Sequence, residues 1–254
     1  MSPREELDEL GYTILPRWLP QDLLAELRAT VAELYDREGD TAGSEFKQEP
    51  GCLRLANLVD KGDVFQHVIA APEILALVEH VLGAEFKLSS LNARTALPGC
   101  DAQPLHADMG AIADEHGYWV CNTVWMLDEY TPDNGPLRVV PGSHRWGKLP
   151  QAELPNLRAM HPREQLVTAP AGTVVVMNAH LWHGGLDNRT TKPRTALHAF
   201  YCRRDKPQQQ YQKQLVRPEV QARLSPAIRR LLAIDDPLND QLAREVTVRS
   251  GFLK

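Results

Sequence analysis

The sequence between Glu85 and Tyr201 is a succession of short runs rich in β-branched and aromatic residues, each closed by a turn. The runs cover 87–97, 104–109, 118–127, 137–140, 165–169, 173–178 and 195–201. Strong turn sequences separate them, such as Pro-Asp-Asn-Gly-Pro at 132–136. This pattern is typical of an all-β fold rather than of alternating βα units, and it predicts a β-barrel or a double-sheet jelly roll.

Helical periodicity flanks the β segment on both sides. The expected elements there are a strand at 11–16, a helix at 20–37, a loop at 39–51, a helix at 72–82 closed by Gly83, and tail helices around Ile228, Leu231, Leu242 and Val246. The chain is therefore expected to form one domain, mainly β with flanking helices and a double-stranded β-helix (jelly-roll, cupin-like) core. Within it we expect N-terminal helices in 1–84, the β core in 85–204 and a helical tail in 205–254.

Charge and composition exclude several functional classes. The 254 residues carry 28 Lys and Arg against 33 Asp and Glu, a net charge of −5 without a basic block, which argues against a nucleic-acid partner. No run of about 18 uncharged apolar residues occurs, and the polar opening lacks a signal-peptide pattern, so we expect a cytoplasmic protein without a membrane partner. The four cysteines lie far apart and form no disulfide-like framework.

A possible metal site is formed by His106 and Asp108, because residues two apart on a strand point to the same face. A second cluster, containing His180 and His183, follows the apolar run at 172–177. Two imidazoles and one carboxylate make the facial triad suited to non-haem Fe(II), which leaves further positions open for other ligands. Only one of the two later histidines is expected to take part, since a three-residue offset on a strand reverses the face.

Arg194 stands eleven residues after His183, at the start of another expected strand. A guanidinium beside a metal can bind the distal carboxylate of a dicarboxylic cosubstrate through two charge-assisted hydrogen bonds. The alternative for such a residue is a surface arginine in an ion pair.

The sequence resembles the phytanoyl-CoA dioxygenase family of Fe(II)/2-oxoglutarate-dependent oxygenases over roughly residues 8–204. The matching stretches are Leu-Gly-Tyr-Thr-Ile-Leu-Pro at 10–16, Gln-Pro-Leu-His-Ala-Asp at 103–108, Asn-Gly-Pro-Leu-Arg-Val-Val-Pro-Gly-Ser-His at 134–144, and His183, Asn188, Arg194 and Tyr201 in order. Four motifs in sequence are far more specific than any one of them. The resemblance covers most of the chain but not its helical tail.

This resemblance implies that His106, Asp108 and His183 bind Fe(II) and act in catalysis, and that Arg194 binds the 5-carboxylate of 2-oxoglutarate. The family's chemistry implies O2 and a small-molecule substrate as partners, with release of succinate and CO2 as a C–H bond is hydroxylated.

Two more residues, Trp125 and Asn92, are expected near the cosubstrate by the same resemblance. His198 shares strand parity with Arg194 and is a candidate for substrate contact. The chain departs from many relatives in having Gly185 where they have Ser, which puts one cosubstrate hydrogen bond in doubt.

Two rival functions remain open from the sequence. One is a cupin-like metal-binding protein without oxygenase activity. The other is a different oxidative outcome on the same scaffold, such as desaturation, cyclisation or halogenation. Halogenases of this type have Ala or Gly in place of the carboxylate ligand, so Asp108 argues against that reaction. The motifs specify neither the substrate nor the oligomeric state.

Overall fold

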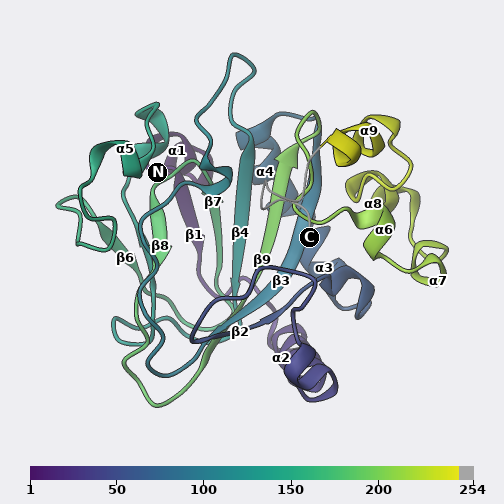
Figure 1. Ribbon diagram of the computed structural model, residues 1–254, viewed down its shortest axis with the longest axis horizontal. Coiled ribbons are helices and arrows are strands. Elements are labelled where there is room, and N and C mark those ends of the chain that lie inside the picture. The colour runs from purple at the N-terminus through teal and green to yellow at the C-terminus, as the bar shows by residue number, and fades with distance from the viewer. Residues whose placement is uncertain (246–254) are drawn as a thin grey trace.

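Two antiparallel sheets form the core of the computed structural model, which describes residues 1–245 (Figure 1). The large sheet has six strands in the order β1-β7-β4-β9-β3-β2, and the small sheet has three in the order β6-β5-β8. The strands are β1 (Tyr12–Leu15), β2 (Cys52–Leu55), β3 (Phe86–Ala96), β4 (Val120–Met126), β5 (Leu137–Val139), β6 (Gln165–Val167), β7 (Val174–Asn178), β8 (His183–Gly185) and β9 (Arg194–Arg203). The predicted mainly β jelly roll with flanking helices is confirmed.

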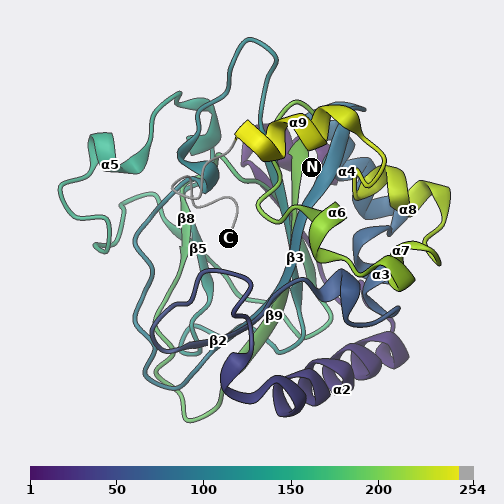
Figure 2. The same cartoon turned by 45° about the vertical axis from the view of Figure 1, so that its right-hand side comes forward.

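Helices cover the outer face of the large sheet, while β5 and β8 lie opposite its inner face (Figure 2). They are α1 (Pro3–Glu9), α2 (Gln21–Glu38), α3 (Phe65–Ile69), α4 (Pro72–Leu82), α5 (Pro150–Glu153), α6 (Gln212–Leu215), α7 (Pro218–Gln221), α8 (Pro226–Leu231) and α9 (Pro237–Glu245), of which α5 lies apart, beside the small sheet. Helix α4 ends as predicted at Gly83, whose φ of +79° is strained for residues with a side chain. Among the described residues, no helix is both long and apolar enough to cross a lipid bilayer.

The register of the large sheet decides which side chains face inward. Arg94 on β3 lies opposite Ala196 on β9, and Asn92 lies opposite His198. On the other side of β9, Val124 of β4 also pairs with His198. Because directly paired residues share a face and alternate residues return to it, all five lie on the inner face.

The residues of opposite parity build the main core beneath the helices. Trp125, Leu197 and Tyr201 are fully buried there with apolar residues of α2 and α4. The Trp125 ring meets Trp18 edge to face at a centroid distance of 5.4 Å. Burying such side chains contributes about 1.5–3 kcal/mol each, so this layer holds the sheet in place and leaves its inner face for the site.

Two details differ from expectation, and one expected position is not among the described residues. The run at 104–109 is not a strand: only His106 pairs, in an isolated bridge to His183, because Pro104 lacks an N–H and a 3₁₀ turn begins at Asp108. The N-terminal part supplies both edge strands of the large sheet: β1 matches the strand expected at 11–16, whereas β2 was not predicted. The expected helical position Val246 lies outside the described residues.

Candidate active site

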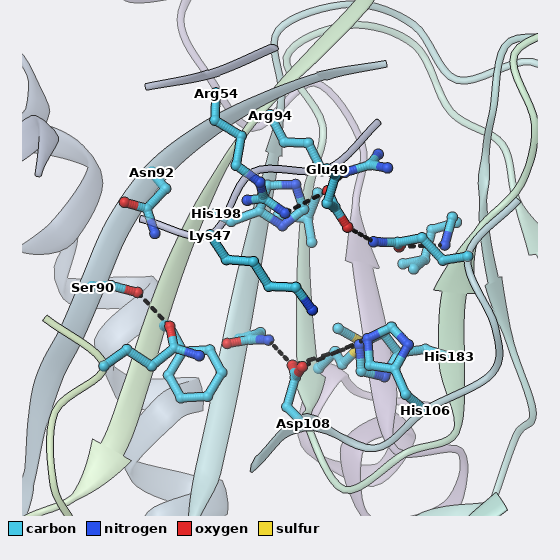
Figure 3. A pocket seen from close by; sticks show the side chains of 18 of the residues that line it. Lys47, Glu49, Arg54, Ser90, Asn92, Arg94, His106, Asp108, His183 and His198 are labelled. Atoms are coloured by element: carbon cyan, nitrogen blue, oxygen red, sulfur yellow. Dashed lines mark hydrogen bonds and ion pairs between the residues drawn. The ribbon is translucent and has the colours of Figure 1, made fainter. Parts of the chain in front are cut away.

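A cavity of about 350 Å³ lies against the inner face of the large sheet (Figure 3). Its lining includes the predicted residues His106, Asp108, His183, Arg194, Asn92 and His198. The structure thus brings residues that are up to 106 positions apart in sequence into one space. Of the predicted site residues, only Trp125 lies elsewhere.

The three predicted metal ligands converge at one end of this cavity. Each of His106, Asp108 and His183 offers a ligand atom, and these atoms lie within 4.8 Å of one another. The Nε2 atoms of the two histidines are 3.7 and 3.5 Å from the carboxylate oxygens of Asp108. Reciprocal backbone hydrogen bonds of 2.9 Å between His106 and His183 fix this approach.

The hydrogen bonds of the two imidazoles suit metal binding. Nδ1 of His106 donates to the carbonyl of Pro104 at 2.9 Å, and Nδ1 of His183 donates to the carbonyl of Leu181 at 2.7 Å. Since a carbonyl only accepts, both Nε2 atoms keep a lone pair that faces Asp108 when the rings are neutral. The side-chain amide of Asn122 also donates to the Asp108 carboxylate. This set of two nitrogens and one oxygen fits the facial triad for Fe(II).

Electrostatics within the triad are dominated by burial and by mutual charge. Burial would raise the pKa of Asp108, but the adjacent His183 holds it below its ordinary value. Burial would lower the pKa of His183, but the Asp108 carboxylate raises it. Burial and the neighbouring His183 together lower the pKa of His106. Asp108 is therefore ready as an anionic ligand.

The structure distinguishes the two later histidines. His180 is buried outside the cavity, and its Nε2 accepts the backbone N–H of Trp119 at 2.8 Å. Its ring lies 5.3 Å from that of Tyr118, centroid to centroid. His183, the first residue of β8, is the one that faces Asp108.

Arg194 is the first residue of β9 and is 2% exposed. Its guanidinium carbon lies 4.1 Å from the ring centroid of Tyr130, and Nη1 donates to the Tyr130 hydroxyl at 2.6 Å. Nη2 donates to the carbonyl of Gly135, and Nε donates to that of Asn134 at 3.4 Å. A guanidinium has five N–H groups, so one on each terminal nitrogen remains for a ligand. No carboxylate among the described residues pairs with Arg194, which is therefore not the surface ion-pair residue of the alternative.

Of the two residues expected near the cosubstrate, one reaches the cavity. Asn92 lines it, and its Oδ1 accepts the backbone N–H of Asn57 at 3.3 Å. Trp125 faces the helical layer instead, with its indole N–H donated to Thr123 at 2.8 Å, so the expectation for Trp125 is corrected. Strand parity is the reason: Val124 takes the inward position.

A neutral imidazole also lies on the cavity floor. Burial, and then the nearby Arg94, lower the pKa of His198 to about 3. Its Nε2 is buried and has no hydrogen-bond partner among the described residues. A free polar atom beside a cavity is available to a ligand.

A charged cluster that the sequence analysis missed closes the outer part of the cavity. Glu49 accepts from Arg54 Nη2 at 2.6 Å, from Arg94 Nε at 2.9 Å and from Gln103 Nε2 at 2.7 Å. Burial opposes ionisation, but the two guanidinium groups lower the pKa of Glu49 to about 2. The neighbouring Lys47 also lines the cavity. Only Arg94 carried a usable signal, since it lies two residues from Asn92 on the same strand face.

Gly185, which stands where the resemblance led us to expect a serine, lies beside this cluster. The N–H of Gly185 donates to Gln103 Oε1 at 2.9 Å. A β-carbon at Gly185 would lie 3.3 Å from that oxygen and 3.6 Å from Arg94 Nη1. Gln103 and Arg94 therefore border the space that a serine side chain would enter.

Comparisons with known proteins agree with this geometry. The family model described as "Phytanoyl-CoA dioxygenase (PhyH)" matches residues 7–196. The dioxygenase af480 of Aspergillus fumigatus is 28% identical over 238 residues, which cover 90% of this chain and 75% of that protein.

Solved structures of similar fold include two iron-bound proteins. EctD from S. alaskensis with bound Fe has a TM-score of 0.65 and 23% identity, covering 79% of this chain and 75% of that one. The epimerase SnoN, in complex with Fe3+, alpha ketoglutarate and nogalamycin RO, has a TM-score of 0.65 and 20% identity, covering 79% and 82%. With the family model spanning most of the sequence and a His-Asp-His site in the cavity, the chain belongs to the phytanoyl-CoA dioxygenase family of iron- and 2-oxoglutarate-dependent oxygenases.

Proposed function

We propose that this enzyme hydroxylates a C–H bond of a small organic molecule, using Fe(II), 2-oxoglutarate and O2 and releasing succinate and CO2. The observation that carries the proposal is the convergence of His106, Asp108 and His183 in the cavity that also contains Arg194. A metal site alone would suit a binding protein as well. A buried arginine without a carboxylate partner among the described residues adds a place for a dicarboxylic cosubstrate.

In this proposal the protein holds the metal through Nε2 of His106, Nε2 of His183 and a carboxylate oxygen of Asp108. The Nδ1 hydrogen bonds to Pro104 and Leu181 keep both imidazoles oriented. The iron, when bound, supplies the activation of O2 that is coupled to decarboxylation of the 2-oxo acid. The remaining work of the protein is to place the substrate C–H bond beside the metal and to exclude water.

Arg194 would bind the distal carboxylate of 2-oxoglutarate. Its two remaining N–H groups, one on each terminal nitrogen, match the two oxygens of a carboxylate. The hydroxyl of Tyr130 and the carbonyl of Gly135 hold the guanidinium plane before the ligand arrives. Such preorganisation lowers the entropy that is lost on binding.

Epimerisation is a second candidate outcome, favoured by the structural likeness to SnoN, which is described as an alpha ketoglutarate dependent epimerase. Halogenation is disfavoured, because the Asp108 carboxylate lies where that reaction needs an open ligand position. The product mass separates the outcomes: hydroxylation adds one oxygen atom, whereas epimerisation leaves the mass unchanged.

The test is an anaerobic incubation of the protein with Fe(II), 2-oxoglutarate and a metabolite library, followed by exposure to O2 and mass spectrometry. We expect a product heavier by one oxygen atom, formed together with succinate and absent with the Asp108→Ala variant. A product of unchanged mass but altered chromatographic mobility would favour epimerisation. Absence of succinate in every mixture, with iron and 2-oxoglutarate bound, would contradict the proposal.

A further inference from the structure

The balance of charge in the cavity indicates what kind of substrate it accepts. Among the described residues, the lining carries four cationic side chains, Lys47, Arg54, Arg94 and Arg194, and two carboxylates, Glu49 and Asp108. In the proposed function, the two positive charges of Fe(II) and the two negative charges of 2-oxoglutarate cancel one another. The loaded cavity therefore keeps a positive surplus that its own residues do not neutralise.

The surplus positive charge can be assigned to particular side chains. Arg194 would pair with the distal carboxylate of 2-oxoglutarate, and the Asp108 carboxylate faces the metal position. Glu49 is shared by Arg54 and Arg94, which leaves that cluster with one net positive charge. Lys47 is the remaining cation, and no carboxylate among residues 1–245 forms an ion pair with it.

Lys47 points into the cavity toward the metal ligands, as Figure 3 shows. Ion pairs of Glu45 and Glu49 hold the chain in place on both sides of Lys47. Before it, Glu45 accepts from Lys61 at 2.8 Å, and after it Glu49 binds the arginine cluster. The segment that carries Lys47 therefore holds this cation at the cavity although the side chain is exposed to solvent.

The wall around Lys47 also contains apolar surface. Phe46, Met109 and Phe200 line the same cavity, and the guanidinium carbon of Arg54 lies 5.4 Å from the ring centroid of Phe46. A ligand that fits both features has a carbon skeleton for these side chains and an anionic group for the ammonium.

We propose that the substrate is an organic acid whose carboxylate binds the ammonium group of Lys47 while its carbon skeleton packs against Phe46 and Phe200. The inference rests on the proposed function and names the substrate class for that site. Lys47 is thus a specificity-determining residue: it favours anions, and the cation surplus disfavours amines at the same position.

The test uses three probes with one skeleton and different charge: phenylacetate, phenylacetamide and phenethylamine. Each is titrated calorimetrically into the anaerobic complex of the protein with Fe(II) and 2-oxoglutarate, at concentrations up to the millimolar range. We expect phenylacetate to bind up to about fivefold more tightly than the amide, because an ion pair with a solvent-exposed ammonium group contributes up to about 1 kcal/mol. The Lys47→Ala variant should lose this preference and Lys47→Arg should keep it. Lys192→Ala, which removes an exposed lysine outside the cavity, serves as the matched control.

Equal binding of acid and amide, phenylacetate binding that survives Lys47→Ala, or no phenylacetate binding at all would overturn the inference. So would displacement of 2-oxoglutarate by phenylacetate, because the anion would then occupy the cosubstrate position. A parallel titration with 2-oxoglutarate separates the two proposals. If 2-oxoglutarate itself fails to bind the iron-loaded protein, the proposed function fails, whereas its binding without probe selectivity contradicts only the substrate class.

Discussion

Replacing Arg194 by alanine is expected to weaken 2-oxoglutarate binding far more than iron binding. The side chain is almost fully buried and is held by Tyr130 and by the carbonyls of Asn134 and Gly135. It touches none of the three metal ligands through a hydrogen bond or an ion pair. Its loss therefore removes the partner of the distal carboxylate and leaves the triad intact.

The magnitude follows from the two N–H groups that Arg194 has left for a ligand. Loss of one partner of a buried, hydrogen-bonded charge pair costs about 2–5 kcal/mol. At about 1.4 kcal/mol per tenfold, affinity should fall between about 30-fold and several thousand-fold. Arg194→Lys should recover part of this, because it restores the charge without the two-pronged geometry. Tyr130→Phe removes only the hydroxyl that orients Nη1 and should cost up to about tenfold.

The assay is an anaerobic titration of 2-oxoglutarate into the iron-loaded proteins, followed through the metal-to-ligand charge-transfer band. Iron content and circular dichroism of each variant provide the controls for metal loading and folding. Unchanged 2-oxoglutarate affinity in Arg194→Ala would refute the assignment. It would mean that another cation in the cavity, such as Arg94, holds the carboxylate.

Four further substitutions test separate parts of the site. His183→Ala should abolish Fe(II) binding, whereas His180→Ala should retain it and lose about 1–3 kcal/mol of stability through an orphaned backbone N–H; metal analysis and thermal unfolding decide this, and the reverse metal result would contradict it. Gly185→Ser adds a hydroxyl beside Gln103 and should tighten 2-oxoglutarate binding by up to about tenfold in the same titration, with weaker binding the opposing result. Glu49→Gln should lower the Tm at pH 7, because the pKa of Glu49, lowered from 4.5 to about 2, represents about 3 kcal/mol of folding free energy. This contribution is present above pH 4.5 and is lost as the pH falls toward 2, so the Tm difference should shrink over that range; a constant difference would contradict the linkage.

Local signals in the sequence were sufficient for much of the fold. Runs of β-branched and aromatic residues between turns located β3, β4, β7 and β9, and Gly83 marked the end of α4. The three residues of the candidate metal site were also proposed from the sequence, and the structure brings them together, although one reason for grouping them was wrong. His106 and Asp108 converge through a single bridge followed by a turn, not through a continuous strand.

The cluster of Glu49, Arg54 and Arg94 and the neighbouring Lys47 were not predicted, because their meeting in the cavity depends on long-range register and on a segment without a periodic pattern. Arg94 lies beside Arg194 only because β3 pairs with β9, which places Arg94 opposite Ala196. Glu49 and Lys47 belong to a segment with no periodic pattern, and ion pairs hold it at the cavity. For Trp125, the strand was predicted correctly but the direction of the side chain was not. Because neighbouring residues on a strand point to opposite faces, the Trp125 ring lies on the outer face and Val124 on the inner one.

The most direct test of the proposed function measures succinate formed from 2-oxoglutarate in air and under nitrogen, with and without Fe(II), for the wild type and for Asp108→Ala. We expect the wild type to form succinate only when both Fe(II) and O2 are present. Asp108→Ala, shown to be folded by circular dichroism, should form none, because a metal held by two histidines alone loses the facial geometry. Succinate formation by Asp108→Ala at the wild-type rate, or its absence in the iron-loaded wild type, would contradict the account.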